Sequence, residues 1–303
     1  MQNMVASVTG LGVLTGLGSS LEELRQRLNA GESSLVPLGE AGWEERLGSR
    51  VAGPRLRELL KRRKDAKLLP RAAQLALPVA AMALGQVQDR ESVGLFVGVR
   101  REPPDDGAAD PAIAASLDES GHLDTGLLSR HGRSLYPPLL PLQTLPNMVL
   151  AHVAINLELM GPGDALCGAD CAGVQALRLA IHAIAEGRCE VALVIVADSP
   201  IDGPSLRDRG RMGQDGPVGE AAVALKLERA GHKDSLMELR DGGAGGQDGP
   251  RPGDCAHREQ LGACELVDPV LELLLGSGHA TGVEASGAWA RVLGSEVHIS
   301  RVL

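Results

Sequence analysis

Apolar and polar residues alternate along the chain in blocks with two different periods, which predict strands and helices in turn. Continuous apolar runs, typical of buried strands, occur at residues 4–8, 92–99, 190–198 and 220–229. Apolar residues at helical spacing predict helices at residues 21–30, 66–84, 147–160 and 173–185. Strands and helices in this order predict an α/β protein with right-handed crossovers and helices on both faces of its sheet.

The stretches between these blocks divide the chain into domains. Residues 100–141, rich in Pro, Gly and Asp, predict a long irregular insertion with one short helix. The sequence DGGAGGQDGPRPGD has too few apolar residues to bury a core and predicts a linker. Beyond it, helical spacing at 265–275 and 283–293 and a terminal EVHIS strand predict a reduced segment. The expected domains are residues 1–240, the linker 241–254 and residues 255–303.

Composition limits the classes of function. The chain has 303 residues, 44% of them hydrophobic, which is enough for a sizeable core. Aromatic residues make up 1%, so Leu, Val and Ala must fill that core, and side chains this small require close packing of helices on the sheet. The net charge of −9 argues against binding to nucleic acid or to an anionic membrane, because both need a basic surface.

Positive charge is concentrated in one segment, RLRELLKRRKDAK at residues 55–67. A solvated helix face is one interpretation, and a docking patch for an acidic partner is the other. The first residues lack the pattern of a secretory signal, and no apolar run is long enough to span a membrane. Five cysteines, an odd number, are typical of reduced thiols. We therefore expect a cytoplasmic protein.

Two patterns suggest a cofactor or a metal and fail on spacing. Gly10, Gly12 and Gly16 lie between a predicted strand and a helix, but the third glycine of a dinucleotide fingerprint falls one place late and no acidic residue follows at the required distance. A tight strand-to-helix turn is the better interpretation. Cys167 and Cys171 could face one another on a helix, but a zinc site needs two further ligands. We expect no cofactor and no metal.

Two residues that precede the predicted helix at 173–185 could carry chemistry. A thiolate at a helix N-terminus is stabilised by the helix dipole and lies beside free backbone N–H groups that can hold an oxyanion, which makes Cys171 a candidate nucleophile. Asp170 is a favoured N-cap whose charge also suits the dipole, which makes it a candidate cap. The helix pattern alone leaves both interpretations open.

Four stretches resemble, in order, the β-ketoacyl-acyl-carrier-protein synthases. VTGLGVLTGLGSSLEELRQRLNAGESSL resembles the opening of that family, with Gly16 in place of its proline. LPNMVLAHVAINLELMGPGDAL is similar to the helix and Gly-Pro turn before the nucleophile, and AGVQALRLAIHAIAEGRCEVALVIVAD to the nucleophile helix and the following strand. GQDGPVGEAAVALKLERA resembles the D-G-F-x-x-G-E-G-A stretch, shortened and without its phenylalanine. The resemblance covers roughly residues 1–230 and implies a thiolase-like α/β fold with a complete N-terminal half and a truncated C-terminal half.

Counting along this resemblance places Asp170 at the nucleophile position. In the family the cysteine lies nine residues after the glycine of Gly-Pro and three before the next glycine, and counts from Gly161 and Gly173 both give residue 170. Cys171 lies one place late, and a shift of one residue turns a helix by about 100°. The family's His-Gly-Thr motif, its lysine and its Phe-Gly segment have no counterpart. GSGHATGVEASGAWARVL resembles the region of the second histidine, which would be His279.

The resemblance therefore implies a non-catalytic subunit of the chain-length-factor type. Such subunits, including those of aryl polyene pathways, pair with a full-length ketosynthase in type II fatty acid or polyketide biosynthesis and help shape the acyl tunnel. The implied partners are that ketosynthase in a heterodimer, or a second copy in a homodimer, and an acyl carrier protein. The strands that meet in the dimer would lie near residues 164–169. Two alternatives are an active β-ketoacyl-ACP synthase or acyltransferase that uses Cys171, and a decarboxylase in which Asp170 replaces the thiol.

Overall fold

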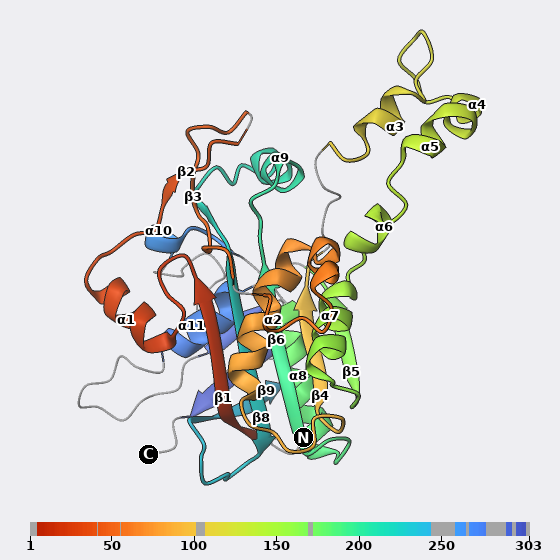
Figure 1. Ribbon diagram of the computed structural model, residues 1–303. Coiled ribbons are helices and arrows are strands. Elements are labelled where there is room, and N and C mark those ends of the chain that lie inside the picture. The colour runs from red at the N-terminus through yellow and green to blue at the C-terminus, as the bar shows by residue number, and fades with distance from the viewer. Residues whose placement is uncertain are drawn as a thin grey trace.

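The computed structural model of the chain describes residues 5–40, 42–54, 56–100, 107–168, 172–243, 258–264, 267–276, 289–292 and 295–300. Its centre is a sheet in the order β10-β11-β9-β1-β8-β6-β4-β5 (Figure 1). The strands are β1 (Val5–Thr15), β4 (Gly94–Val99), β5 (Gly163–Cys167), β6 (Val191–Asp198), β8 (Ala221–Arg229), β9 (Met237–Gly243), β10 (Trp289–Val292) and β11 (Ser295–Ser300). Parallel pairing occurs between β4 and β5 and between β4 and β6, whereas the other neighbours are antiparallel. The sheet is therefore mixed.

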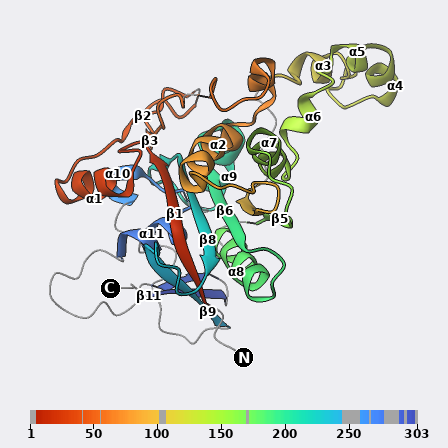
Figure 2. The ribbon, with the colours of Figure 1, turned by 60° about the horizontal axis from the view of Figure 1, so that its bottom comes forward.

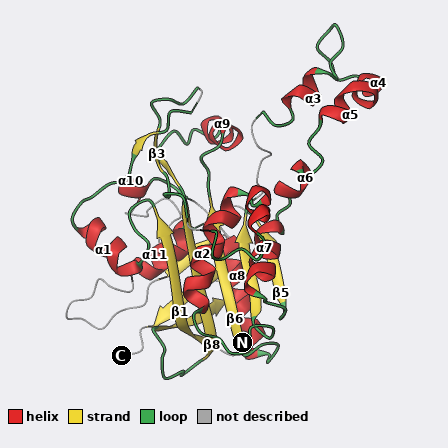
Figure 3. Ribbon diagram, in the orientation of Figure 1, coloured by secondary structure: helices red, strands yellow, loops and turns green. Residues whose placement is uncertain are grey.

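Helices cover both faces of this sheet, as the sequence predicts. One face packs against α2 (Arg71–Leu84) and α7 (Met148–Leu157), and the other against α8 (Ala172–Ala185) and α11 (Asp268–Gly276) (Figures 2 and 3). The body also contains α1 (Leu21–Asn29), the 3-10 helix η1 (Arg63–Leu68), α9 (Gly203–Arg211) and α10 (Arg258–Leu261). A small second sheet joins β2 (Val36–Pro37), β3 (Leu47–Ser49) and β7 (Val218–Gly219). No helix in the described part of the chain has the length and apolar composition that a bilayer crossing requires.

Aliphatic side chains fill the space on both faces of the sheet. On β6, Ala192, Val194 and Val196 pack on the α8 side, whereas Leu193 and Ile195 pack on the α2 side. Each of these residues is at most 1% exposed. The alternation follows from the two-residue repeat of a strand. It confirms the prediction of a strand buried on both faces in this region.

The first helix begins and ends where its capping residues predict. The Ser20 hydroxyl accepts a hydrogen bond from the Glu23 backbone N–H at 3.1 Å, and the Glu23 carboxylate accepts one from the Ser19 N–H at 3.0 Å. The first bond satisfies an N–H group that the helix itself leaves unpaired, and the second joins the helix to the residue before its cap. Gly31 follows the helix with a φ of 72°, a left-handed conformation that favours glycine.

The prediction of a tight turn at the glycine-rich segment is wrong, because β1 continues through it to Thr15. The glycines serve close packing instead of a turn. A Cβ atom on Gly10 would lie 2.0 Å from the carbonyl oxygen of Ala83, and one on Gly12 would lie 2.2 Å from that of Val79. Both carbonyls belong to α2, so the helix backbone rests on the strand where side chains are missing.

The predicted helix at 66–84 is interrupted. Leu69 has extended backbone angles (φ −76°, ψ 119°), and α2 begins only after Pro70. The residue before a proline is driven out of helical conformation, and the proline ring itself has no N–H to donate. Residues 63–68 accordingly form the separate turn η1.

The predicted irregular insertion contains several short helices instead of one. They are α3 (Asp110–Ala114), α4 (Thr125–Leu127), the π-helical turn η2 (Leu128–Gly132), α5 (Arg133–Leu135) and α6 (Leu140–Gln143). Together they build residues 107–145, called the arm below, which projects away from the sheet and its covering helices (Figure 1).

Two predictions near the C-terminus also need correction. The start of the predicted linker falls within a strand, because β9 extends to Gly243; residues 244–254 lie outside the described residues, and the linker there stays a prediction. The predicted helix at 283–293 is wrong at residues 289–292, which form β10 and pair with β11. That pairing overrides the local helical spacing of the apolar residues.

Gly12→Ala is expected to lower the free energy of unfolding by about 1–3 kcal/mol, because the new methyl group must push α2 away from β1. Gly53→Ala is the matched control, since a Cβ there meets no atom within 4 Å and the change should stay within about 0.5 kcal/mol. Urea unfolding of both variants measures the difference. Equal losses for the two would contradict the packing role of Gly12.

Candidate functional site

The carboxyl ends of the parallel strands β4, β5 and β6 lie at one edge of the sheet, and α8 begins there. At the end of β5, Cys167 stands opposite Val99, and the Gly168 N–H donates a hydrogen bond to the Val99 carbonyl at 3.1 Å. This bond holds the chain against β4 as it leaves β5. The helix then starts at Ala172. In α/β folds, ligands bind beyond the carboxyl ends of the strands, so this edge is the candidate site.

A close backbone contact fixes the start of α8 on β4. A Cβ atom on Gly98 would lie 2.8 Å from both the Cα and the N of Gly173. The absence of a side chain on both residues lets the first turn of the helix rest directly on the strand. The N–H groups that the first turn of a helix leaves without an intrahelical partner, and the positive end of the helix dipole, therefore lie over the edge where the strands end.

The residues that the sequence singles out for chemistry are not among those that the structure describes. Asp170 and Cys171 belong to residues 169–171, between Gly168 and Ala172, and His279 belongs to residues 277–288. Their roles remain predictions. Cys167, the last residue of β5, is exposed. Within the described ranges, no group of three or more His, Cys, Asp or Glu residues could hold a metal ion.

A buried carboxylate lies at the same edge, where β8 begins beside the end of β6. Glu220 has a side chain that is 2% exposed, and it receives two hydrogen bonds from Arg71, at 2.8 Å from Nε and 2.6 Å from Nη2. The Ser199 hydroxyl and the Val51 N–H each donate another at 2.8 Å. Burial alone raises the pKa of Glu220, but Arg71, Ser199 and Val51 outweigh it and hold the pKa below its usual value.

These four donors occupy the hydrogen-bonding sites of the carboxylate. Glu220 therefore has no free lone pair with which to take a proton from a substrate. Its bonds instead join the start of α2, the end of β6 and the loop at Val51. The ion pair of Glu220 with Arg71 therefore has a structural role next to the candidate site.

A second buried carboxylate ends β6. Asp198 accepts a hydrogen bond from the Ser199 N–H at 2.8 Å and pairs with Arg100 at 3.1 Å. Burial raises the pKa of Asp198, and the charge of Arg100 opposes that rise. Arg100 is the residue that follows β4, so this ion pair joins the carboxyl ends of two neighbouring strands.

Sequence reasoning missed these two ion pairs. The apolar pattern places Asp198 at the end of the predicted strand at 190–198, and Glu220 lies within the stretch GQDGPVGEAAVALKLERA that resembles the family. The cations that pair with them lie far away in the sequence, in the first turn of α2 and directly after β4. The available signal was a charged residue at each end of an apolar run, because a carboxylate at the limit of a buried strand needs a cation or several N–H groups.

Comparison with known proteins identifies the family. The profile of the β-ketoacyl synthase N-terminal domain matches residues 4–220, and the chain belongs to that family. Its mixed α/β architecture is the thiolase-like fold that the sequence predicts. A search of curated proteins found no match.

Solved structures share the fold at low sequence identity. A chain from the complex of a type II polyketide synthase acyl-carrier protein with its ketosynthase bound to the hexaketide has a TM-score of 0.60 and 16% identity, over 78% of this chain and 67% of that one. A β-ketoacyl synthase from Burkholderia phymatum has a TM-score of 0.58 and 19% identity, over 90% and 72%. The ishigamide ketosynthase/chain length factor has a TM-score of 0.57 and 20% identity, over 84% and 72%.

Arg71→Met is expected to lower the free energy of unfolding by about 3–5 kcal/mol at neutral pH, because it leaves the buried Glu220 carboxylate without its cation. The deficit should shrink as the pH falls, since burial then raises the Glu220 pKa in the variant and a protonated carboxyl needs no cation. The wild-type protein has the opposite dependence, because its lowered Glu220 pKa makes it lose stability on acidification.

Arg211→Ala is the matched control for this experiment. Arg211 pairs with Asp208 at 3.2 Å, but the two side chains are 78% and 67% exposed. An exposed ion pair contributes at most about 1 kcal/mol. Denaturant unfolding at several pH values measures both variants. A loss for Arg71→Met no larger than that for the control would contradict the structural role of the buried pair.

Proposed function

We propose that this chain is a non-catalytic, chain-length-factor-like ketosynthase subunit that pairs with an active β-ketoacyl-ACP synthase in type II fatty acid or polyketide biosynthesis. The observation that carries the proposal is the residue at the nucleophile position. In a chain that belongs to the β-ketoacyl synthase family, counts from both sides place Asp170 where the family has its cysteine. A carboxylate cannot form the acyl thioester on which condensation depends.

The geometry beside residue 170 supports this count. Gly161 precedes β5 and Gly173 lies in the first turn of α8, and both are fixed by close backbone contacts. A Cβ on Gly161 would lie 2.5 Å from the Val93 carbonyl oxygen, and Gly173 packs on Gly98. Cys171 could stand at the nucleophile position only with an insertion before it and a deletion after it. The close contacts of Gly161 and Gly173 argue against such changes in chain length on either side.

Edge strand β5 supports the pairing. Within the described residues it pairs only with β4, so its other side presents N–H and C=O groups that another strand could satisfy. The Gly168 N–H points toward β4, and N–H groups of alternate residues in a strand point the same way. The Ala165 N–H, three residues earlier, therefore points away from β4. The ketosynthase/chain length factor among the similar structures fits such a pairing.

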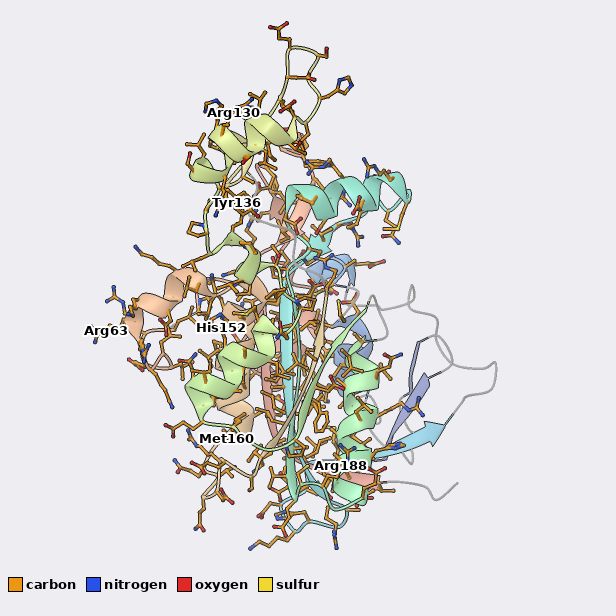
Figure 4. The ribbon with its side chains drawn as sticks, turned by 90° about the vertical axis from the view of Figure 1, so that its right-hand side faces the viewer. Arg63, Arg130, Tyr136, His152, Met160 and Arg188 are labelled. Carbon is orange, nitrogen blue, oxygen red and sulfur yellow. The ribbon has the colours of Figure 1, made fainter. Side chains whose placement is uncertain are left out.

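An acyl carrier protein is the second partner in the proposal. The fold is shared with a chain from a complex of a ketosynthase with its acyl-carrier protein. In this protein, exposed cations gather on one segment next to α7, where Arg63 lies (Figure 4). They are Arg57, Lys61, Arg62, Arg63, Lys64 and Lys67. An acidic carrier protein could contact this concentration of positive charge, so the proposal takes the segment as a docking patch and not only as a solvated face.

The first test concerns acylation. The purified protein, incubated with an acyl-loaded carrier protein, is expected to show no gain in intact mass, because Asp170 cannot hold a thioester. The paired ketosynthase under the same conditions is the positive control. A mass gain that peptide mapping places on Cys171 would overturn the non-catalytic assignment in favour of an active synthase or acyltransferase.

The second test concerns pairing. Co-expression with the ketosynthase from the same locus is expected to give a one-to-one complex. Ala165→Pro should weaken it about tenfold or more, because proline removes an N–H that faces the partner and leaving the partner's carbonyl unsatisfied costs about 1–3 kcal/mol. Ala165→Ser keeps the N–H and serves as the control. Equal affinity of both variants by interferometry would contradict pairing through β5, and a complex of two identical copies would favour a homodimer.

A further inference from the structure

A buried histidine lies where the segment with the exposed cations meets α7. This segment, residues 56–69, includes η1 and is called the basic segment below. Figure 4 shows η1, marked by Arg63, next to α7, marked by His152. His152 is 7% exposed. Its ring is therefore largely shielded from water while the basic segment stays in place.

The two nitrogens of the His152 ring have different surroundings. The Leu68 carbonyl, near the end of the basic segment, accepts a hydrogen bond from the ring. Nε2 is buried and has no hydrogen-bond partner among the described residues. A neutral imidazole has one donor and one acceptor nitrogen, so the bond to Leu68 assigns the single proton to Nδ1. Protonation would place a second N–H on Nε2, where these residues offer no acceptor.

The charges around His152 do not compensate for its burial. Burial lowers the pKa of His152, whereas the Leu68 carbonyl and the charge of Asp65 raise it to a smaller extent. Among the elements that pack together here, α7 and β4 carry no charged residue, and the single charge of α2, on Arg71, is bound to Glu220. The other charged residues of the basic segment and the residue after α7 are exposed: Arg57, Glu58, Lys61, Arg62, Arg63, Lys64, Lys67 and Glu158. The neutral ring is therefore the form that suits the segment in place.

The contacts that hold the basic segment on α7 lie close to His152. The Asn156 side chain accepts a hydrogen bond from the Lys61 backbone N–H at 2.9 Å and donates one to the His152 carbonyl at 2.8 Å. Leu60 and Leu69 are buried in the apolar cluster that also contains residues of α2 and α7. The rest of the segment is mostly exposed, and segments with few buried contacts open locally at low cost.

We propose that His152 is a pH-sensitive latch, whose neutral ring holds the basic segment on α7 and whose protonation releases it. Release exposes the ring to water, where an imidazolium is hydrated and its pKa is about 6.5. Opening therefore takes up a proton and is favoured as the pH falls below that value. The released segment no longer holds its cations together on one surface. The latch is a property of this chain alone and does not depend on the proposed partners.

Hydrogen exchange of the backbone amides of residues 56–69 in the full chain tests the latch. After correction for the intrinsic exchange rate, opening of the segment should increase about three- to tenfold between about pH 7.5 and about pH 5.5, because each pH unit below the pKa of the open form contributes at most tenfold. The amides of α8 report on the body, and their protection should change less than about twofold. An equal loss of protection in both regions would indicate general acid unfolding and contradict the latch.

Two variants remove the titrating ring in different ways. His152→Gln keeps a neutral donor for the Leu68 carbonyl, and His152→Leu fills the site with an apolar side chain. Both are expected to show no increase in opening over this pH range, whatever their opening at neutral pH. His122→Leu is the matched control, because His122 is exposed in the arm, and it should keep the wild-type increase. No increase in the wild-type protein, or an increase of wild-type size in both His152 variants, would overturn the latch.

Discussion

Direct contact between helix backbone and strand is the constraint on which the rest of the fold depends. The chain has almost no aromatic side chains to fill wide gaps, so helices must lie close to the sheet. Gly10 and Gly12 on β1 receive α2, and Gly98 on β4 receives Gly173 of α8. Each contact is made at a glycine, which has no side chain to keep the helix away. The two helices are thereby fixed on opposite faces of the sheet.

The same close packing buries charged side chains at the ends of the strands. Because the sheet is sealed on both faces, carboxylates at the ends of its strands are buried, and each needs its own cation. Arg71 satisfies Glu220 and Arg100 satisfies Asp198. These pairs tie α2 and β4 to the edge where α8 begins. The start of α8 therefore rests on strand ends that ion pairs and close backbone contacts hold in place.

The sequence predicted the architecture well and the long-range polar contacts poorly, for a physical reason. Periodicity is a local property, so the buried strand at β6 and the helix at α8 could be predicted from their own residues. The extended backbone at Gly10 and Gly12 could not be predicted in this way. Those glycines are required by the close contact with α2, which lies much later in the chain. Arg71 and Glu220 are likewise joined only by the fold. At the candidate site, the positions of Asp170, Cys171 and His279 remain predictions, whereas the surrounding strand ends and the start of α8 are described.

The proposed loss of the nucleophile is compatible with retention of the surrounding strands and helix if the turn before α8 has a second role. An enzyme needs the turn before α8 to present a thiolate, whereas a partner subunit needs it to connect edge strand β5 to the helix at a fixed distance. The proposed interface uses β5 directly, and the arm begins and ends at neighbouring elements of the same edge. In the proposal, an aspartate at residue 170 removes the acyl-accepting thiol, whereas β5 and α8 keep their places. A change at Gly98 or Gly173 would shift α8, and with it the strand edge on which the proposed pairing depends.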